Sequence, residues 1–83
     1  MTDIETAVRD IVSHVAGSLR AGYGLNPSEK LCKAGLDSAD VLMIVVHIER
    51  KYGIVFPARD ISHFFSLRDI VDITNRKLKE KGQ

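Results

Sequence analysis

The sequence of 83 residues is poor in the residues that mark several classes of protein. It has no tryptophan, one cysteine, two prolines and six glycines. One cysteine cannot form a disulfide framework or hold a metal alone, and so little Pro and Gly excludes fibrous repeats and low-complexity disorder. No apolar run approaches the roughly eighteen residues of a membrane-spanning helix, and the N-terminus lacks the basic-then-apolar order of a signal peptide. We therefore expect a cytoplasmic protein without stable membrane insertion.

The chain also has little net charge. Its formal charge is +1 at pH 7, and its Lys and Arg residues are spread along the sequence apart from a short C-terminal cluster. This distribution gives no electrostatic case for nucleic acid binding. Hydrophobic residues make up 45% of the chain, enough for the core of one small domain. We expect residues 1–83 to form a single, monomeric domain.

Apolar residues recur at helical spacing near the N-terminus. A capping box at 2–5, with Thr2 as the cap, predicts the start of a helix. The pattern continues to Leu19, and Ala21 to Gly24 would stop the helix. Gly17 falls inside it and should only loosen its last turn. The apolar positions are Ile4, Val8, Ile11, Val12, Val15 and Leu19.

Two further helices are predicted. One covers about residues 38–52 and ends at Gly53; the other begins at the capping box 66–69 and continues through Leu78. Residues 26–35 form a long loop with one turn at 27–30, residues 54–57 an extended connector, and residues 59–65 one or two helical turns. Leu31 and Leu36 should pin the long loop to the core. The prediction is an all-α fold: a small bundle of three main helices plus one short helix, with a long loop between the first two.

The helix at 38–52 is apolar on two sides. One stripe suits the core and consists of Val41, Ile44, Val45, Ile48 and Tyr52. The roughly opposite face carries Ala39, Met43 and Val46, with Leu42 between the two and Arg50 below. This second side either packs under a neighbouring segment or forms an exposed apolar strip, and we favour an exposed docking surface.

A serine stands at the first turn of the same helix. Ser38 follows Asp37, and Asp37 and Asp40 are spaced as a cap. A hydroxyl at this place is exposed and faces the positive end of the helix dipole, which suits a covalently attached phosphate. No neighbour in the sequence could act as a base for Ser38, so a catalytic triad is not supported.

These residues resemble the acyl carrier proteins of fatty-acid and polyketide synthesis. The resemblance rests on Leu36-Asp37-Ser38, on the helix end Glu49-Arg50-Lys51-Tyr52-Gly53-Ile54, on Pro57 and Asp60, and on Ser66-Leu67-Arg68-Asp69-Ile70. It covers nearly the whole chain, from the first helix to about Leu78.

The resemblance implies a non-catalytic carrier. A separate phosphopantetheinyl transferase, using coenzyme A and magnesium, would attach 4'-phosphopantetheine to Ser38, and the arm would present acyl thioesters to acyl-loading and acyl-processing enzymes. Asp37 would cap the helix and contact the transferase. The partner-docking residues would be Ala39, Leu42, Met43, Val46 and Arg50.

Two departures from the family indicate a specialised carrier with dedicated partners. Ala39 stands where a bulky apolar residue is usual after the serine. Met43 replaces a common Glu, and Arg50 and Lys51 replace acids near the helix end.

Two other functions stay open, an aminoacyl or peptidyl carrier and an unmodified helical interaction module in which Ser38 is only part of the cap.

The remaining candidate residues have simpler interpretations. Cys32 is expected to be a partly buried loop residue, and the three histidines show no metal-ligand spacing with each other or with Cys32, so no metal site is predicted. Phe64 and Phe65 should contribute to the core and to a lid, with one ring able to line a cavity for an acyl chain. The basic tail 77–81 is expected to be a solvated helix end.

Overall fold

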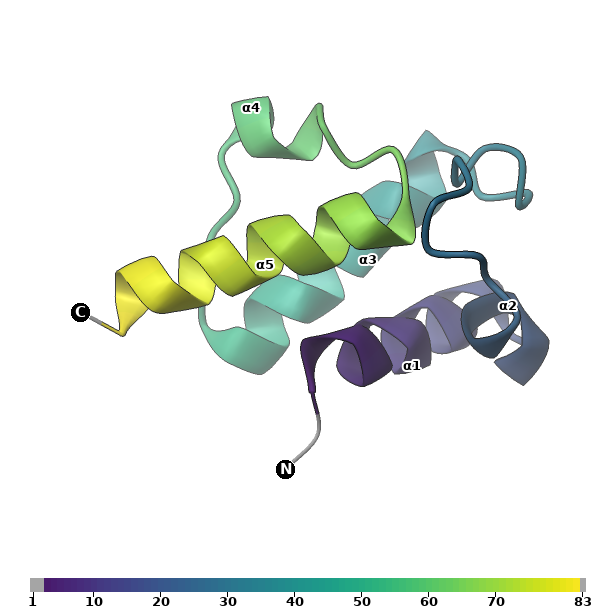
Figure 1. Ribbon diagram of the computed structural model, residues 1–83, viewed down its shortest axis with the longest axis horizontal. Coiled ribbons are helices and arrows are strands. Elements are labelled where there is room, and N and C mark those ends of the chain that lie inside the picture. The colour runs from purple at the N-terminus through teal and green to yellow at the C-terminus, as the bar shows by residue number, and fades with distance from the viewer. Residues whose placement is uncertain (1–2, 83) are drawn as a thin grey trace.

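The computed structural model describes residues 3–82, and these residues form helices and connecting loops (Figure 1). The all-α class predicted from the sequence is confirmed. The helices are α1 (Ile4–Ala16), α2 (Leu19–Tyr23), α3 (Ser38–Tyr52), α4 (Ala58–Ile61) and α5 (Leu67–Lys81).

The three long helices enclose the core. α1 packs against both α3 and α5, and it runs antiparallel to them (Figure 1). The C-terminal ends of α3 and α5 are joined by a hydrogen bond of 2.7 Å that Lys81 Nζ donates to the Tyr52 carbonyl oxygen. The largest side chains with almost no exposure come from all three helices: Val8, Val12, Ile44, Ile48, Leu67, Ile70 and Thr74. Within residues 3–82, no helix has the length and apolarity needed to cross a bilayer.

The N-terminal cap of α1 differs from the prediction. Asp3, not Thr2, is the N-cap, because its carboxylate accepts a 2.7 Å hydrogen bond from the backbone N–H of Thr6. Thr2 itself lies outside the described residues. The Asp3 carboxylate thus satisfies an N–H that the first turn of any helix leaves without a partner.

The predicted extension of α1 to Leu19 is wrong. The helix ends at Ala16, and Gly17 adopts a left-handed conformation with φ of 74°, instead of continuing the helix to Leu19. The Ser18 N–H then closes the end by bonding to the Ser13 carbonyl oxygen at 3.0 Å. A separate short helix, α2, begins at Leu19, whose side chain is exposed and not part of the core. The fold therefore has two short helices where one was expected.

The predicted boundaries of α3 are confirmed, as is the N-terminal box of α5. α3 spans Ser38–Tyr52 and stops at Gly53, whose φ is 64°. α5 begins after Ser66, and the reciprocal bonds of Ser66 and Asp69 form the predicted capping box. The connector at 54–57 is extended, as predicted, and α4 provides a single turn after it.

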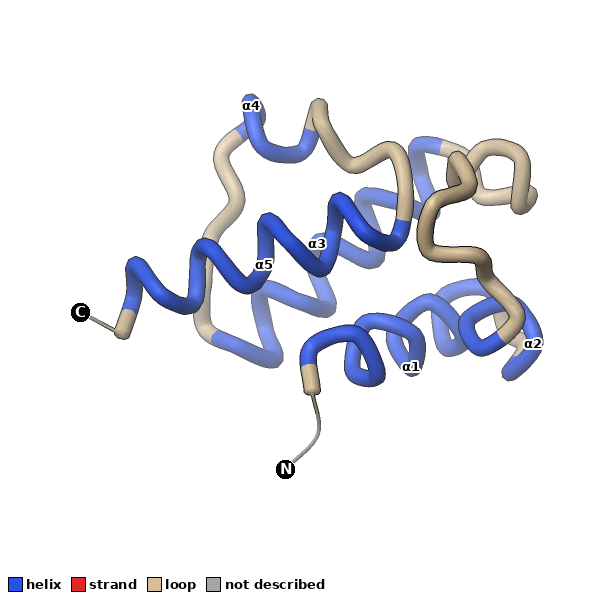
Figure 2. The backbone as a smooth tube through the Cα atoms, viewed as in Figure 1, coloured by secondary structure: helices blue, strands red, loops and turns tan. Residues whose placement is uncertain are grey.

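The long loop between α2 and α3 lies against the start of α5 (Figure 2). Leu31 and Leu36 are buried, which confirms their predicted role as anchors. The turn predicted at 27–30 closes one residue earlier, where the Glu29 N–H bonds to the Asn26 carbonyl oxygen at 3.1 Å. Two backbone bonds fasten the loop: Leu31 N–H to the Phe65 carbonyl oxygen at 2.7 Å and Arg68 N–H to the Pro27 carbonyl oxygen at 3.0 Å.

Candidate functional site

The start of α3 presents Ser38 to solvent. The N-cap is Asp37, whose Oδ1 accepts from the Asp40 N–H at 2.9 Å, while Asp40 Oδ2 accepts from the Asp37 N–H at 3.1 Å. This reciprocal box satisfies the helix end without the serine. The Ser38 hydroxyl makes no hydrogen bond to any residue between 3 and 82. It is therefore exposed and available for chemistry at the positive end of the helix dipole.

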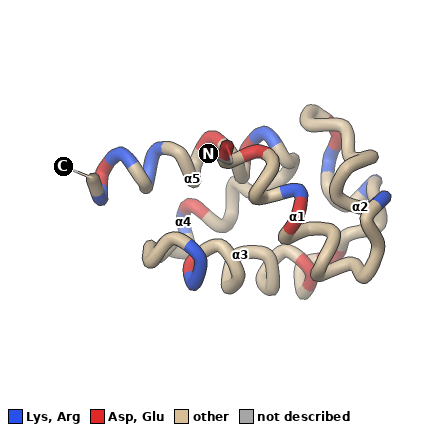
Figure 3. The backbone as a smooth tube through the Cα atoms, turned by 90° about the horizontal axis from the view of Figure 1, so that it is seen from below, with Lys and Arg blue, Asp and Glu red and all other residues tan. Residues whose placement is uncertain are grey.

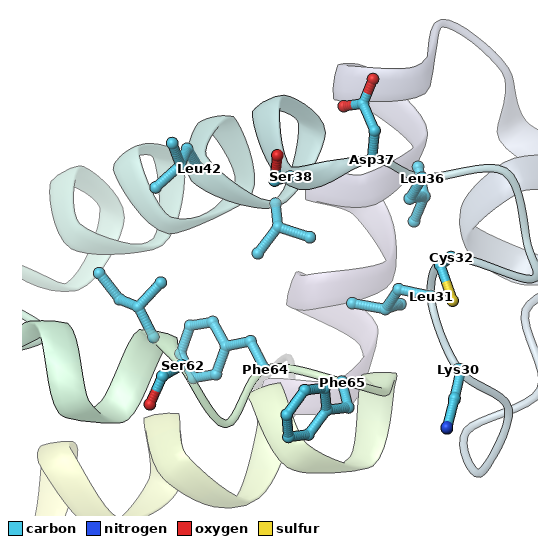
Figure 4. A pocket seen from close by; sticks show the side chains of 12 residues that line it. Lys30, Leu31, Cys32, Leu36, Asp37, Ser38, Leu42, Ser62, Phe64 and Phe65 are labelled. Atoms are coloured by element: carbon cyan, nitrogen blue, oxygen red, sulfur yellow. The ribbon is translucent and has the colours of Figure 1, made fainter.

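Ser38 lies on the rim of an apolar pocket of about 370 Å³ (Figure 4). In the close view its oxygen is directed away from the rings of Phe64 and Phe65, and so is the carboxylate of Asp37. A group attached to the Ser38 oxygen would therefore start outside the pocket and could fold back into it. The apolar lining residues are Leu31, Leu36, Val41, Leu42, Ile61, Phe64 and Phe65, and the remaining ones are Lys30, Cys32, Asp37, Ser38 and Ser62.

Three segments distant in sequence are held together around this pocket. The α2–α3 loop is fixed by the Leu31–Phe65 backbone bond described above. The segment after α4 is fixed by Phe64, whose ring packs edge-to-face on Phe56 with ring centroids 5.2 Å apart. The third segment is α3 itself, with Val41 and Leu42. The pocket thus depends on tertiary packing of the loops and not on one helix.

Ion pairs of the buried Asp60 tie α4, which contributes Ile61 to the pocket, to α5. Asp60 Oδ1 lies 2.7 Å from Arg76 Nη2, and its Oδ2 lies 3.5 Å from Lys77 Nζ. Burial of Asp60 favours its neutral form, but the hydrogen bond and charge of Arg76, with those of Lys77, outweigh burial and lower the pKa of this carboxyl. Asp60 is therefore ionised at neutral pH and anchors α4.

The candidate docking residues on α3 fall mostly on its solvent side. Leu42 and Met43 are 53% and 49% exposed, Ala39 and Arg50 are also exposed, and Val46 is half-buried. On the opposite side, Ile44, Val45 and Ile48 are buried as predicted. The second apolar side of α3 is therefore exposed at Ala39 and Met43, as we favoured, and half-buried at Val46.

Other residues singled out in the sequence occupy simpler positions. Cys32 is exposed on the pocket rim, not partly buried as predicted. His14 and His47 pack edge-to-face at 5.2 Å between α1 and α3, and no three potential metal ligands gather anywhere in the described part of the chain. Phe64 is buried and Phe65 is 58% exposed, so the pair divides between the core and the pocket mouth.

Part of the pocket was not predictable from the sequence. Leu31 and Leu36 were expected as anchors and the Phe pair as a candidate lining, whereas Ile61, Ser62 and Cys32 were not expected at the pocket. Ile61, an apolar residue in a predicted helical turn, was the only signal for this part of the pocket. A short turn alone does not show which helix its apolar residue faces.

The sequence matches the family described as "Phosphopantetheine attachment site" over residues 6–74. The chain belongs to this family, and the domain is a site for covalent attachment of 4'-phosphopantetheine.

The fold is also similar to the crystal structure of an acyl carrier protein from Thermotoga maritima. The two share 25% sequence identity, with a TM-score of 0.79, and the match covers 92% of this chain and 87% of that one. Together with the family match, this similarity supports an acyl carrier role and the resemblance identified in the sequence. Domains of this type are generally non-catalytic and interact with a phosphopantetheinyl transferase and acyl-processing enzymes.

Proposed function

We propose that residues 1–83 form a single carrier domain in which Ser38 holds the 4'-phosphopantetheine arm and acyl groups are carried as thioesters on its thiol. The observation that carries this proposal is the free, exposed Ser38 hydroxyl at the first turn of α3, beside an apolar pocket. The helix N-terminus favours the phosphodiester that attachment creates. The carrier supplies no catalysis of its own; a flexible arm raises the local concentration of cargo at each partner enzyme.

The same geometry supports roles for the flanking residues. Asp37 forms the cap that places Ser38, and its exposed carboxylate is directed outward, where a separate transferase with coenzyme A and magnesium could contact it. The side chains that follow Ser38 on the outer side of α3, which are exposed apart from the half-buried Val46, form the docking surface. We name this surface the α3 strip, made of Ala39, Leu42, Met43, Val46 and Arg50.

The pocket supports an apolar acyl cargo. Seven of its twelve lining residues are aliphatic or aromatic, and a polar or charged acyl end placed against these side chains would lose hydration without gaining partners. We propose service in cytoplasmic fatty-acid, polyketide or related specialised biosynthesis, as a monomer with dedicated partner enzymes. The apolar α3 strip supports dedicated partners, since apolar contact is less dependent on long-range charge steering.

Mass spectrometry of the intact protein tests the attachment site. We expect wild-type chain, incubated with a broad-specificity transferase, coenzyme A and magnesium, to gain the mass of one phosphopantetheine. Ser38→Ala should gain none, while its thermal unfolding midpoint stays close to wild type because Asp37 and Asp40 still close the helix end. Ser28→Ala, which changes an exposed serine outside α3, serves as a loading control.

Loading of Ser38→Ala, or no mass gain in folded wild type, would refute the proposal. The latter result would favour an unmodified interaction module.

A further inference from the structure

The acidic side chains of α3 are committed to the ends of the helix. Asp40 bonds to the Asp37 N–H at the N-terminus. Glu49 is half-buried, and its Oε2 accepts a 2.8 Å hydrogen bond from the Phe56 N–H in the connector after α3. Neither carboxylate belongs to the α3 strip. The acids of this helix therefore stabilise the fold and are poorly placed to attract a partner.

A cation, in contrast, ends the α3 strip. Arg50 is exposed and makes no ion pair within residues 3–82. Lys51 follows it, also exposed, with its Nζ 5.9 Å from the centre of the Tyr52 ring. Figure 3 shows Lys and Arg at the C-terminal end of α3 and uncharged residues along its middle. The strip thus runs from Ser38 through exposed Leu42 and Met43 to an unpaired positive charge.

We propose that the partner enzymes of Ser38, from the transferase that attaches the arm to the enzymes that act on its cargo, dock on the α3 strip with an apolar surface that carries carboxylate groups opposite Arg50. This inference rests on the proposed function and adds the chemistry of the partner. An apolar partner patch buries Leu42 and Met43, and a carboxylate gives Arg50 the counter-charge that the chain itself does not supply.

The helix sets the spacing of the partner's features. Arg50 follows Ser38 by twelve residues, which at about 1.5 Å per residue places the charge about 18 Å from the attachment point along the helix. The partner's carboxylate should therefore lie about 18 Å from the entrance of the channel that admits the arm. A partner with Lys or Arg at that position would meet like charge and dock less well.

Loading kinetics with two purified transferases test the inference. The transferases are chosen by the surface beside their coenzyme A site: one apolar with Asp and Glu, the other rich in Lys and Arg. We expect the wild type to have at least a threefold lower KM with the acidic, apolar enzyme. Arg50→Glu should raise that KM at least threefold and lower the KM with the basic enzyme. Met43→Glu, which adds a negative charge to the α3 strip, should likewise raise the KM with the acidic enzyme and lower the KM with the basic enzyme.

Arg20→Glu is the matched control, because Arg20 is an exposed arginine on α2 and its reversal changes the net charge equally. It should leave both KM values within twofold of wild type. The inference is overturned if the wild type prefers the basic enzyme, if Arg50→Glu moves both values alike, or if Arg20→Glu reproduces its effect. Absence of any loading of the folded wild type would instead refute the proposed function, and this inference with it.

Discussion

At the scale of single residues, Asp37 and Ser38 divide two tasks at the start of α3. Asp37 forms the cap with Asp40, and this leaves the Ser38 hydroxyl without a structural bond in the described chain. A serine used as the N-cap would have its oxygen engaged by a backbone N–H. Placing the cap one residue earlier therefore makes the serine available for modification.

Asp37→Ala and Asp37→Asn should separate the two roles proposed for this residue. Asn caps helices about as well as Asp, whereas Ala costs about 1 kcal/mol, which lowers Tm by about 4–8 °C in a domain of this size. We expect Asp37→Ala to lose both stability and loading rate, and Asp37→Asn to keep its stability but load more slowly. Calorimetry and intact-mass kinetics measure the two effects. Wild-type loading by Asp37→Asn would show that the transferase does not use the Asp37 charge.

The charge of Asp60 should contribute to stability, because it is buried and paired with two cations. Its ion pairs lower its pKa, so they stabilise the fold above the ordinary Asp pKa, and this contribution is lost as pH falls through the lower folded pKa. Asp60→Asn should cost about 2 kcal/mol at pH 7, the value of hydrogen bonds to a buried charge. Urea unfolding should show the difference shrinking in acid. The exposed Asp72→Asn is the control and should change little at either pH.

At the scale of helices, what the sequence predicts depends on how local the cause is. The ends of α3 and the start of α5 were predictable, because capping boxes and Gly53 act within a few residues. The break at Gly17 and the separate α2 were not. Gly17 gives the same local signal as Gly53, but it lies inside an apolar pattern that continues to Leu19. The position of α2 depends on its packing against α1, where Arg9 donates hydrogen bonds of 2.8 Å to the carbonyl oxygens of both Gly22 and Leu25.

Gly22→Ala should show how tightly α2 is packed. A Cβ at Gly22 would lie 2.0 Å from the Arg9 carbonyl oxygen and 2.2 Å from Ser13 Oγ. Backbone of α1 cannot yield to it, so α2 must move away and the Arg9 bonds must stretch or break. We expect a loss of about 3 kcal/mol, at the upper end for overpacking. Denaturant unfolding measures this loss.

Gly82→Ala is a suitable comparison for Gly22→Ala. Gly82 has a φ of −74°, and its Cβ would approach nothing nearer than the Leu78 carbonyl oxygen at 3.3 Å. Its stability should therefore stay near wild type. Equal stability of the two variants would mean that α1 and α2 are not in close contact.

At the scale of the whole molecule, the pocket is a product of the topology. Ser38, the loop anchors and the Phe pair could each be identified along the sequence, but their meeting around one cavity could not. It requires the α2–α3 loop to bond to Phe65 and α4 to be held to α5 through Asp60. These contacts join residues far apart in sequence, and no periodic pattern encodes them. The pocket beside Ser38 is thus a property of the assembled fold.

A loaded apolar chain should stabilise this fold. Burying two methylene groups in the pocket is worth about 1.6 kcal/mol, which in a domain of this size raises Tm by roughly 6–13 °C. We expect the octanoyl-loaded carrier to melt higher than the same protein with a free arm thiol. A malonyl group, whose carboxylate is excluded from apolar walls, should give no increase. Calorimetry of the three forms, with the loading verified by mass, measures the shift in Tm.

Phe64→Leu removes ring contacts from the pocket wall. In this variant the octanoyl group should raise Tm by less than in wild type, while the malonyl form should melt at the same temperature as the variant with a free arm thiol. Equal melting of octanoyl and malonyl forms would show that the cargo stays outside the pocket, on an arm that extends into solvent.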